Sequence, residues 1–167
     1  MLEGSIKYNE GKIGIVVSRF NADITENLLK GALCALKKYK VPKEKIEVMK
    51  VPGAFEIPLA AQKLLRGGCG TIIALGVVII GETEHFEYVC KEVADGIMRI
   101  QLDEGKPVIF EVLMVDDVKK AQARSQVPSD ACGNHPADSP GWMKNKGYIA
   151  GLNALEMLYL YGKMERS

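Results

Sequence analysis

The feature that most constrains the fold is a regular alternation of short apolar segments with longer segments of helical periodicity. Residues 71–80, TIIALGVVII, are apolar at almost every position, as expected of a strand buried on both faces of a parallel sheet. Three further segments rich in β-branched or alternating side chains predict strands at 12–18, 46–51 and 107–113. Apolar side chains at helical spacing predict helices at about 24–39, 57–65, 86–100, 117–124 and 148–161. Asn21 and Asp23 are plausible caps of the first helix.

Strands that alternate with helices imply right-handed crossovers and a parallel sheet covered on both sides. We therefore expect an α/β fold, a three-layer α/β/α sandwich with a four-stranded parallel sheet, flavodoxin-like, in one domain spanning residues 1–167. A chain of 167 residues can bury enough apolar surface to fold without disulfides or metals. Residues 125–146 interrupt the alternation with three prolines and two glycines, which predicts an extended loop without regular structure.

Composition excludes several classes of function. The 22 basic and 21 acidic residues give a net charge of +1, which speaks against a nucleic-acid partner. Residues 71–80 are half as long as a membrane span, and the first residues lack a signal-peptide pattern, so we expect a cytoplasmic protein with no membrane partner. The cysteines are scattered without a C-x-x-C pair, which predicts free thiols and no metal site; they are Cys34, Cys69, Cys90 and Cys132.

Ligands of an open parallel sheet bind beyond the carboxyl ends of its strands, which selects residues 18–21, 52–56, 81–86 and 113–117. The third segment, GETEHF, carries the most chemistry. Because it lies between a strand and a long helix, the amides of 81–83 can point at an anion, and Thr83 adds a hydroxyl. Histidine is the side chain most often used for proton transfer, so His85 could act as a general acid or base. Alternatively, Thr83 caps the helix and His85 is a solvated surface residue.

Aromatic and acidic side chains occur at the same edge. Phe20 and Phe55 could stack on a planar ring or anchor core packing instead. Glu56 opens a helix, where the macrodipole favours a carboxylate, and it might equally bind substrate hydroxyls. His135 lies in the Pro/Gly segment and is expected to be exposed to solvent. Neither a Walker loop nor a G-x-G-x-x-G fingerprint is present, so a nucleotide-binding flavodoxin-like protein is the least favoured reading.

Together these segments resemble the lumazine synthases (6,7-dimethyl-8-ribityllumazine synthases) of riboflavin biosynthesis. The resemblance runs from about residue 13 to 158. It is carried by GIVVSRFN at 14–21, VPGAFEIP at 51–58, ALG at 74–76, GETEHF at 81–86, PVIF at 107–110, Arg124 and NKG at 145–147.

The resemblance implies a transferase that condenses 5-amino-6-(D-ribitylamino)uracil with 3,4-dihydroxy-2-butanone 4-phosphate, without a metal or organic cofactor. It implies one catalytic residue, His85, which shuttles protons. It also implies that Phe20 stacks on the pyrimidine and that Ala54, Phe55 and Glu56 hold the ribityl chain. Gly81, Glu82 and Thr83 would surround the phosphate with the help of Arg124. Phe110 and Lys146 would complete the pocket, with Phe110 and Arg124 reaching it from a neighbouring subunit.

Some positions depart from the family's pattern. Ile80 stands where arginine is usual and Glu111 where glycine is typical, which places bulk and negative charge near the pocket wall. Both changes make the local field less positive, so we expect reduced affinity for phosphate. Ile149 replaces a polar residue in the last helix and would form an apolar patch if exposed. The usual short connection before that helix is replaced by the long segment 125–144.

The resemblance also implies self-association. Family members form pentamers, and in many of them twelve pentamers close into a 60-subunit icosahedral shell. Because a long connection before the last helix obstructs contacts between pentamers, we expect a homopentamer, with the shell as the second possibility. Residues 5–10 could add a strand to a neighbour's sheet edge. The alternative function is a catalytically weakened or inactive scaffold that acts as an oligomeric assembly module, and a third is a flavin- or lumazine-binding relative.

Overall fold

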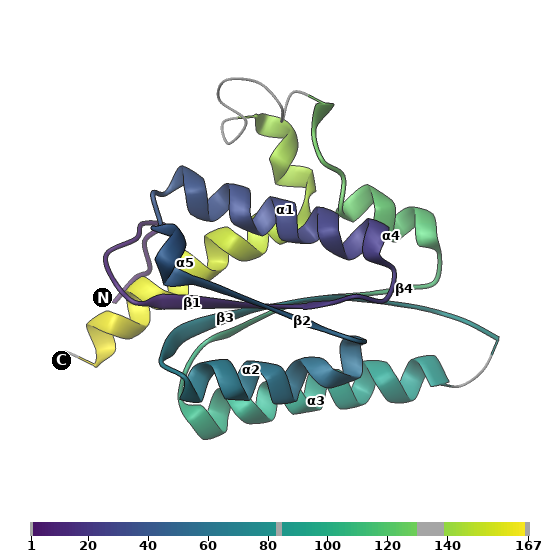
Figure 1. The fold of residues 1–167 in the computed structure, drawn as a ribbon, viewed down its shortest axis with the longest axis horizontal. Coiled ribbons are helices and arrows are strands. Elements are labelled where there is room, and N and C mark those ends of the chain that lie inside the picture. The colour runs from purple at the N-terminus through teal and green to yellow at the C-terminus, as the bar shows by residue number, and fades with distance from the viewer. Residues whose placement is uncertain (1, 83–84, 130–138, 166–167) are drawn as a thin grey trace.

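The computed structural model describes residues 2–82, 85–129 and 139–165. Its centre is a four-stranded parallel sheet of order β2-β1-β3-β4, formed by β1 (Lys12–Ser18), β2 (Ile46–Val51), β3 (Cys69–Ile79) and β4 (Val108–Val115). The helices are α1 (Ala22–Lys38), α2 (Ile57–Arg66), α3 (His85–Glu104), α4 (Val118–Arg124) and α5 (Lys146–Met164). Figure 1 shows α1 and α5 on one face of the sheet and α2 and α3 on the other. The expected three-layer α/β/α, flavodoxin-like fold is confirmed.

The apolar character of β3 follows from its place in the centre of these layers. Ile73 and Leu75 pack into a core under α1 and α5, whereas Ile72 and Ala74 pack into a second core under α2 and α3. All four side chains are fully buried. Removing a side chain of the size of isoleucine or leucine from water contributes about 1.5–3 kcal/mol, so β3 stabilises both cores at once.

The start of α1 differs from the expected capping. Asn21 occupies the cap position with a left-handed backbone (φ 56°), and its side chain makes no capping hydrogen bond. Its carbonyl oxygen instead accepts from the amides of Ile24 and Thr25, at 3.0 and 3.1 Å. Asp23 lies in the first turn of the helix and does not cap it. Asn21 is therefore the cap residue of α1, as predicted, although only its backbone bonds to the first turn, and the prediction of Asp23 as a cap is wrong.

The prediction that residues 125–146 lack regular structure is wrong in their C-terminal part. A 3-10 helix, η5, spans Pro140–Lys144, and the side chain of Ser139 caps it by accepting from the Gly141 amide at 3.3 Å. Trp142 is buried and stacks on Tyr148 with ring centroids 5.9 Å apart. Ile149 packs half-buried against this pair, so the apolar patch expected from an exposed Ile149 is also wrong. Residues 130–138, which include Cys132 and His135, lie outside the described residues.

A buried asparagine fixes the first turn of α5. Asn145 is fully buried, and its side-chain oxygen accepts from the Tyr148 amide at 3.1 Å. Its side-chain nitrogen donates to the carbonyl oxygens of Asn27 in α1 and of Ser125 and Gln126 after α4, at 3.0, 3.0 and 3.2 Å. Because a buried polar group that lost these partners would be costly, the start of α5 is held firmly against α1.

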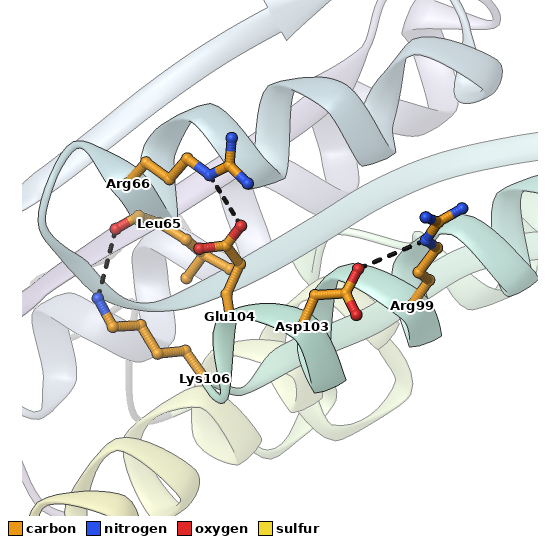
Figure 2. A network of polar contacts seen from close by, with 6 residues as sticks. All are labelled: Leu65, Arg66, Arg99, Asp103, Glu104 and Lys106. Atoms are coloured by element: carbon orange, nitrogen blue, oxygen red, sulfur yellow. Dashed lines mark hydrogen bonds and ion pairs between the residues drawn. The ribbon is translucent and has the colours of Figure 1, made fainter.

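The ends of α2 and α3 are joined by polar contacts far from the carboxyl ends of the strands (Figure 2). Arg66 donates from Nε to Glu104 Oε1 at 2.8 Å, and Lys106 donates from Nζ to the Leu65 carbonyl oxygen at 3.4 Å. A second pair, Arg99 and Asp103, lies within α3 at 3.4 Å. Only the contacts of Arg66 and Lys106 join the two helices of this layer.

Both termini lie at this same end of the molecule (Figure 1). Lys7 places its ammonium 4.5 Å from the centre of the Tyr159 ring in α5, so the N-terminal segment lies against α5 of its own chain. Residues 5–10 form no strand within the described chain, and strand addition to a neighbour stays a prediction. Of the described cysteines, Cys34, Cys69 and Cys90 are not in disulfides, as expected.

Candidate active site

A cavity of about 580 Å³ opens at the carboxyl edge of the sheet, where the sequence predicts the ligand site. One wall is the turn after β2, which contains the short 3-10 helix η2 (Ala54–Glu56). The end of β3, at 77–79, forms the floor, and the first turns of α3 form the opposite wall. Phe20, which follows β1, completes the lining. Three strand ends therefore contribute to one cavity.

Two phenylalanine rings lie exposed at this cavity. Phe20 is 70% exposed and Phe55 59% exposed, so neither ring anchors the core of this chain. Large exposed apolar side chains beside a cavity are typical of a surface that a ligand or partner covers. An aromatic face left open to solvent can stack on a planar ring, which favours the ligand-binding interpretation of Phe20 over the packing one.

The turn after β2 is held by hydrogen bonds at both ends. The Gly53 amide donates to Glu56 Oε2 at 2.9 Å, which closes the turn upon itself. The Phe20 amide donates to the Pro52 carbonyl oxygen at 3.1 Å, which joins the turn to the end of β1. Ala54 is buried beneath the turn. The Glu56 carboxylate is therefore positioned at the cavity by the backbone amide of Gly53.

The N-terminal end of α3 supplies the titratable group. His85 is the first residue of α3, is exposed and lines the cavity together with Gly81. No described atom lies within 4 Å of the point where a Gly81 side chain would begin, so the space beside this backbone is open. Glu82 is exposed but does not line the cavity. Thr83 lies outside the described residues, so the complete anion cradle of 81–83 stays a prediction.

Three predicted site residues lie outside this cavity. Phe110 is 41% exposed on β4, and by strand alternation it shares the face of Val108 and Val112, toward α2 and α3. Arg124 ends α4 and donates from Nη1 to the Lys120 carbonyl oxygen at 3.0 Å. Lys146 is the first residue of α5 and is exposed. A single chain does not bring these three residues together with Phe20 and His85.

The two substituted positions near the site have different surroundings. Ile80 is half exposed directly after β3, and its amide donates to the Val115 carbonyl oxygen at 2.9 Å. Glu111 lies on the face of β4 opposite to Phe110 and does not line this cavity, so negative charge near the pocket wall stays a prediction. Burial raises the pKa of Glu111, and the positive charge of Lys146 partly opposes this effect. The resulting pKa is about 7.

Sequence reasoning missed several residues that line the cavity. Tyr88 and Val89 follow His85 by three and four positions on α3, and Phe86 lies beside it. The signal that could have found Tyr88 and Val89 is helical spacing, because residues at i+3 and i+4 share a face with His85. The end of β3 also contributes, because Val77 and Val78 precede the GETEHF segment in the sheet.

The described residues form neither a metal-binding cluster nor a membrane-spanning helix. Within residues 2–82, 85–129 and 139–165, no group of three or more His, Cys, Asp or Glu side chains is placed to hold a metal ion. In the same part of the chain, the helices are too short or too polar to cross a membrane.

Comparison with known proteins connects this cavity to a family. The model of the 6,7-dimethyl-8-ribityllumazine synthase family matches residues 10–161. The chain is also 42% identical over 165 residues to the 6,7-dimethyl-8-ribityllumazine synthase of Thermococcus kodakarensis, and the match covers 98% of this chain and 95% of that protein. Both matches include the strand ends, the turn after β2 and the first turns of α3 that build the cavity. The chain therefore belongs to the 6,7-dimethyl-8-ribityllumazine synthase family.

Proposed function

We propose that the protein is a transferase of riboflavin biosynthesis that makes 6,7-dimethyl-8-ribityllumazine. Its substrates are 5-amino-6-(D-ribitylamino)uracil and 3,4-dihydroxy-2-butanone 4-phosphate. The observation that carries the proposal is the cavity of about 580 Å³ in which Phe20, the Ala54–Glu56 turn and His85 meet. Family membership and the relative at 42% identity support it, and they do not favour an inactive assembly module.

The cavity suits a substrate with a flat ring and a polar chain. The exposed ring of Phe20 stacks on the pyrimidine, and the turn at Ala54–Glu56 holds the ribityl chain, with the Glu56 carboxylate accepting from its hydroxyls. The apolar floor at Val77 and Val78 excludes water from the reacting atoms. Because both reactants are held in one cavity, a bimolecular step becomes effectively unimolecular.

The chemistry requires proton transfers and no electron transfer. The amine of the pyrimidine attacks the ketone, and loss of water gives a Schiff base. Elimination then releases phosphate, and ring closure with loss of a second water gives the lumazine. His85 moves protons in these steps, because it lines the cavity and histidine is the side chain most often used as a general acid or base. As proposed, the reaction uses no metal or organic cofactor.

The phosphate of the second substrate lies at the N-terminal end of α3. Amides at the start of a helix point toward an anion and the helix dipole favours negative charge there, so residues 81–83 form the cradle. Arg124 adds positive charge, and Phe110 and Lys146 complete the site. Because one chain keeps Arg124 and Phe110 away from its own cavity, a second copy supplies them. We propose a cytoplasmic homopentamer of one-domain chains, with a 60-subunit shell as the alternative.

Mixing the purified protein with both substrates tests the proposal, since the lumazine product is fluorescent. We expect product from the unaltered protein and a KM for the pyrimidine that rises about tenfold in Phe20→Ala. Leu102→Ala is the matched control, because Leu102 is 71% exposed on α3 and does not line the cavity. Absence of product from the unaltered protein would overturn the proposed activity and favour the assembly module.

A further inference from the structure

Tyr88 is a cavity-lining side chain that none of the sequence motifs includes. It lies three residues after His85 on α3. Residues three and four apart share a helix face, and His85, Tyr88 and Val89 all line the cavity, so this face of α3 forms its wall. Tyr88 is 66% exposed, so its ring does not anchor the core of the chain. The side chain is therefore open to a ligand in the cavity.

Tyr88 brings a hydrogen-bond donor to a lining that has few polar side chains. Of the described residues that line the cavity, only Glu56, His85 and Tyr88 carry a polar group on the side chain. The Glu56 carboxylate only accepts, and its Oε2 already accepts from the Gly53 amide at 2.9 Å. A phenolic hydroxyl both donates and accepts. Tyr88 and His85 are therefore the two described lining side chains that can donate a hydrogen bond to a ligand.

Tyr88 lies farther from the start of α3 than His85 does. Because an α-helix rises about 1.5 Å per residue, three residues carry Tyr88 about 4.5 Å along the helix axis. His85 begins the helix, where the proposed phosphate site lies. The helix also packs against η2, the turn proposed to hold the ribityl chain. Tyr88 is therefore displaced from the phosphate site, on the wall opposite to the turn that contains Glu56.

A ribityl chain needs hydrogen-bond partners of both kinds, because each of its hydroxyls donates one hydrogen bond and accepts others. Glu56 supplies an acceptor on one wall of the cavity, and Tyr88 supplies a donor on the other. Phosphate is bound most strongly by charged donors. A neutral phenol hydroxyl therefore suits the uncharged chain of the pyrimidine better than the phosphate of the second substrate.

We propose that Tyr88 is a specificity-determining residue, whose hydroxyl donates a hydrogen bond to the ribityl chain of the pyrimidine substrate. The inference rests on the proposed function, in which that chain lies against the turn at Glu56. A site that bonds a substrate hydroxyl discriminates against an analogue without it, because the polar group of the site then loses its partner. Tyr88 thereby helps the cavity to select a pyrimidine that carries a polyol chain.

Calorimetric titration with two unreactive pyrimidines tests the inference without the reaction. One is 6-(D-ribitylamino)uracil, which keeps the chain, and the other is 6-(methylamino)uracil, which lacks it; neither carries the 5-amino group that attacks the ketone. We expect Tyr88→Phe, which removes only the hydroxyl, to raise Kd of the ribityl compound about threefold to tenfold and to change Kd of the methyl compound by less than about twofold. Tyr161→Phe is the matched control and should leave both Kd values unchanged, because Tyr161 lies on α5 and does not line this cavity. Equal weakening of both compounds in Tyr88→Phe, or no weakening of either, would overturn the inference.

Steady-state kinetics assign the contact to one of the two substrates. We expect Tyr88→Phe to raise KM for the pyrimidine about threefold to tenfold, while kcat and KM for the butanone phosphate stay within about twofold. A raised KM for the butanone phosphate with an unchanged KM for the pyrimidine would overturn the inference. If the unaltered protein makes no lumazine, the proposed function fails. The titrations still test Tyr88 in that case, because they require no turnover.

Discussion

The Gly53 amide donates a hydrogen bond to the Glu56 carboxylate at 2.9 Å, and this bond closes the turn that forms one wall of the cavity. It is a local bond between residues three positions apart, at the junction of β2 and α2. The carboxylate also lies where α2 begins, and the helix dipole favours negative charge there. One side chain thus shapes the turn and favours the helix, and in the proposed function it also presents an acceptor to the ligand.

Replacing Glu56 separates its structural contribution from ligand binding. We expect Glu56→Ala to lower the free energy of unfolding by about 0.5–1 kcal/mol, through loss of the bond to Gly53, and to raise KM for the pyrimidine about tenfold. Glu56→Gln keeps an acceptor oxygen and should fall between the two proteins in both respects. Urea unfolding and steady-state kinetics measure these effects. A KM that is equal in Glu56→Ala and the unaltered protein would remove Glu56 from the site.

Replacing Ile80 by arginine tests whether the protein binds phosphate weakly, as expected from the sequence. The residue is half exposed directly after β3 and next to Gly81, where an arginine side chain would bring positive charge close to the cradle. We expect Ile80→Arg to lower KM for the butanone phosphate about threefold to tenfold, with less effect at high ionic strength because salt screens exposed charges. Ile80→Gln controls for polarity without charge. An unchanged KM in Ile80→Arg would contradict the expectation of reduced phosphate affinity.

Glu111 should make stability depend on pH. Its pKa in the folded protein is about 7, above the ordinary value of 4.5, because burial disfavours the carboxylate. The unfolded chain therefore releases this proton first as pH rises. Protonated Glu111 therefore contributes to the free energy of unfolding. This contribution is fully present below pH 4.5 and is lost as pH rises through about 7.

Glu111→Gln removes this loss. We expect the variant to be more stable than the unaltered protein by about 1–2 kcal/mol at pH 8 and equal to it near pH 4, after allowance for water that still reaches a half-buried group. Urea unfolding at the two pH values measures the difference. A variant that is less stable than the unaltered protein at pH 8 would contradict the prediction.

The ion pair between Arg66 and Glu104 should contribute to stability and leave activity unchanged. It joins α2 to α3 at the end of the molecule away from the cavity, and the Glu104 side chain is only 17% exposed (Figure 2). A double-mutant cycle with Arg66→Met and Glu104→Gln should give a coupling energy of about 0.5–1 kcal/mol.

The pair Arg99 and Asp103 in the same region is the control for this cycle. Its side chains are 81% and 56% exposed, and its atoms are 3.4 Å apart, so its coupling should be close to zero. Equal coupling in the two pairs would show that burial of Glu104 does not strengthen its contact with Arg66.

The sequence predicted the layers of the fold because its signals are local and strong. The consecutive apolar side chains of 71–80 require burial on both faces, and only the centre of a covered sheet provides it. The boundaries of β1 and β2 agree with the structure because a glycine- or proline-containing turn follows β2 and a polar turn follows β1.

The predictions for 125–146 and for the start of α1 were partly wrong, because the outcome there depends on tertiary contacts that local sequence patterns do not show. Prolines and glycines in 125–146 predict a loop, but Pro140 begins a 3-10 helix whose Trp142 is buried against Tyr148, a contact made through tertiary packing. Asp23 is a typical capping residue too, but Asn21, two positions earlier, already begins α1 and leaves Asp23 in the first turn. Both outcomes depend on how the chain is folded around these residues.

The sequence predicted that Phe20, the 54–56 turn and His85 lie at one edge of the sheet, and they line one cavity there; their roles toward a ligand stay predictions. Phe20, the 54–56 turn and His85 follow consecutive strand ends, so the rule for parallel sheets places them at one edge. Tyr88 was missed because the motif ends before it, although it shares the helical face of His85. The strand-end rule does not place Phe110, Arg124 and Lys146 with Phe20, and none of the three lines the cavity of one chain.

The central claim is that the cavity between Phe20, the 54–56 turn and His85 holds the substrates. A crystal structure of the protein with a pyrimidine substrate analogue and inorganic phosphate tests it most directly. We expect the analogue ring to stack on Phe20, its chain to lie against Glu56, and phosphate to lie at the start of α3 beside His85. An analogue bound elsewhere, with the Phe20 ring and the Glu56 turn left uncovered, would contradict the account.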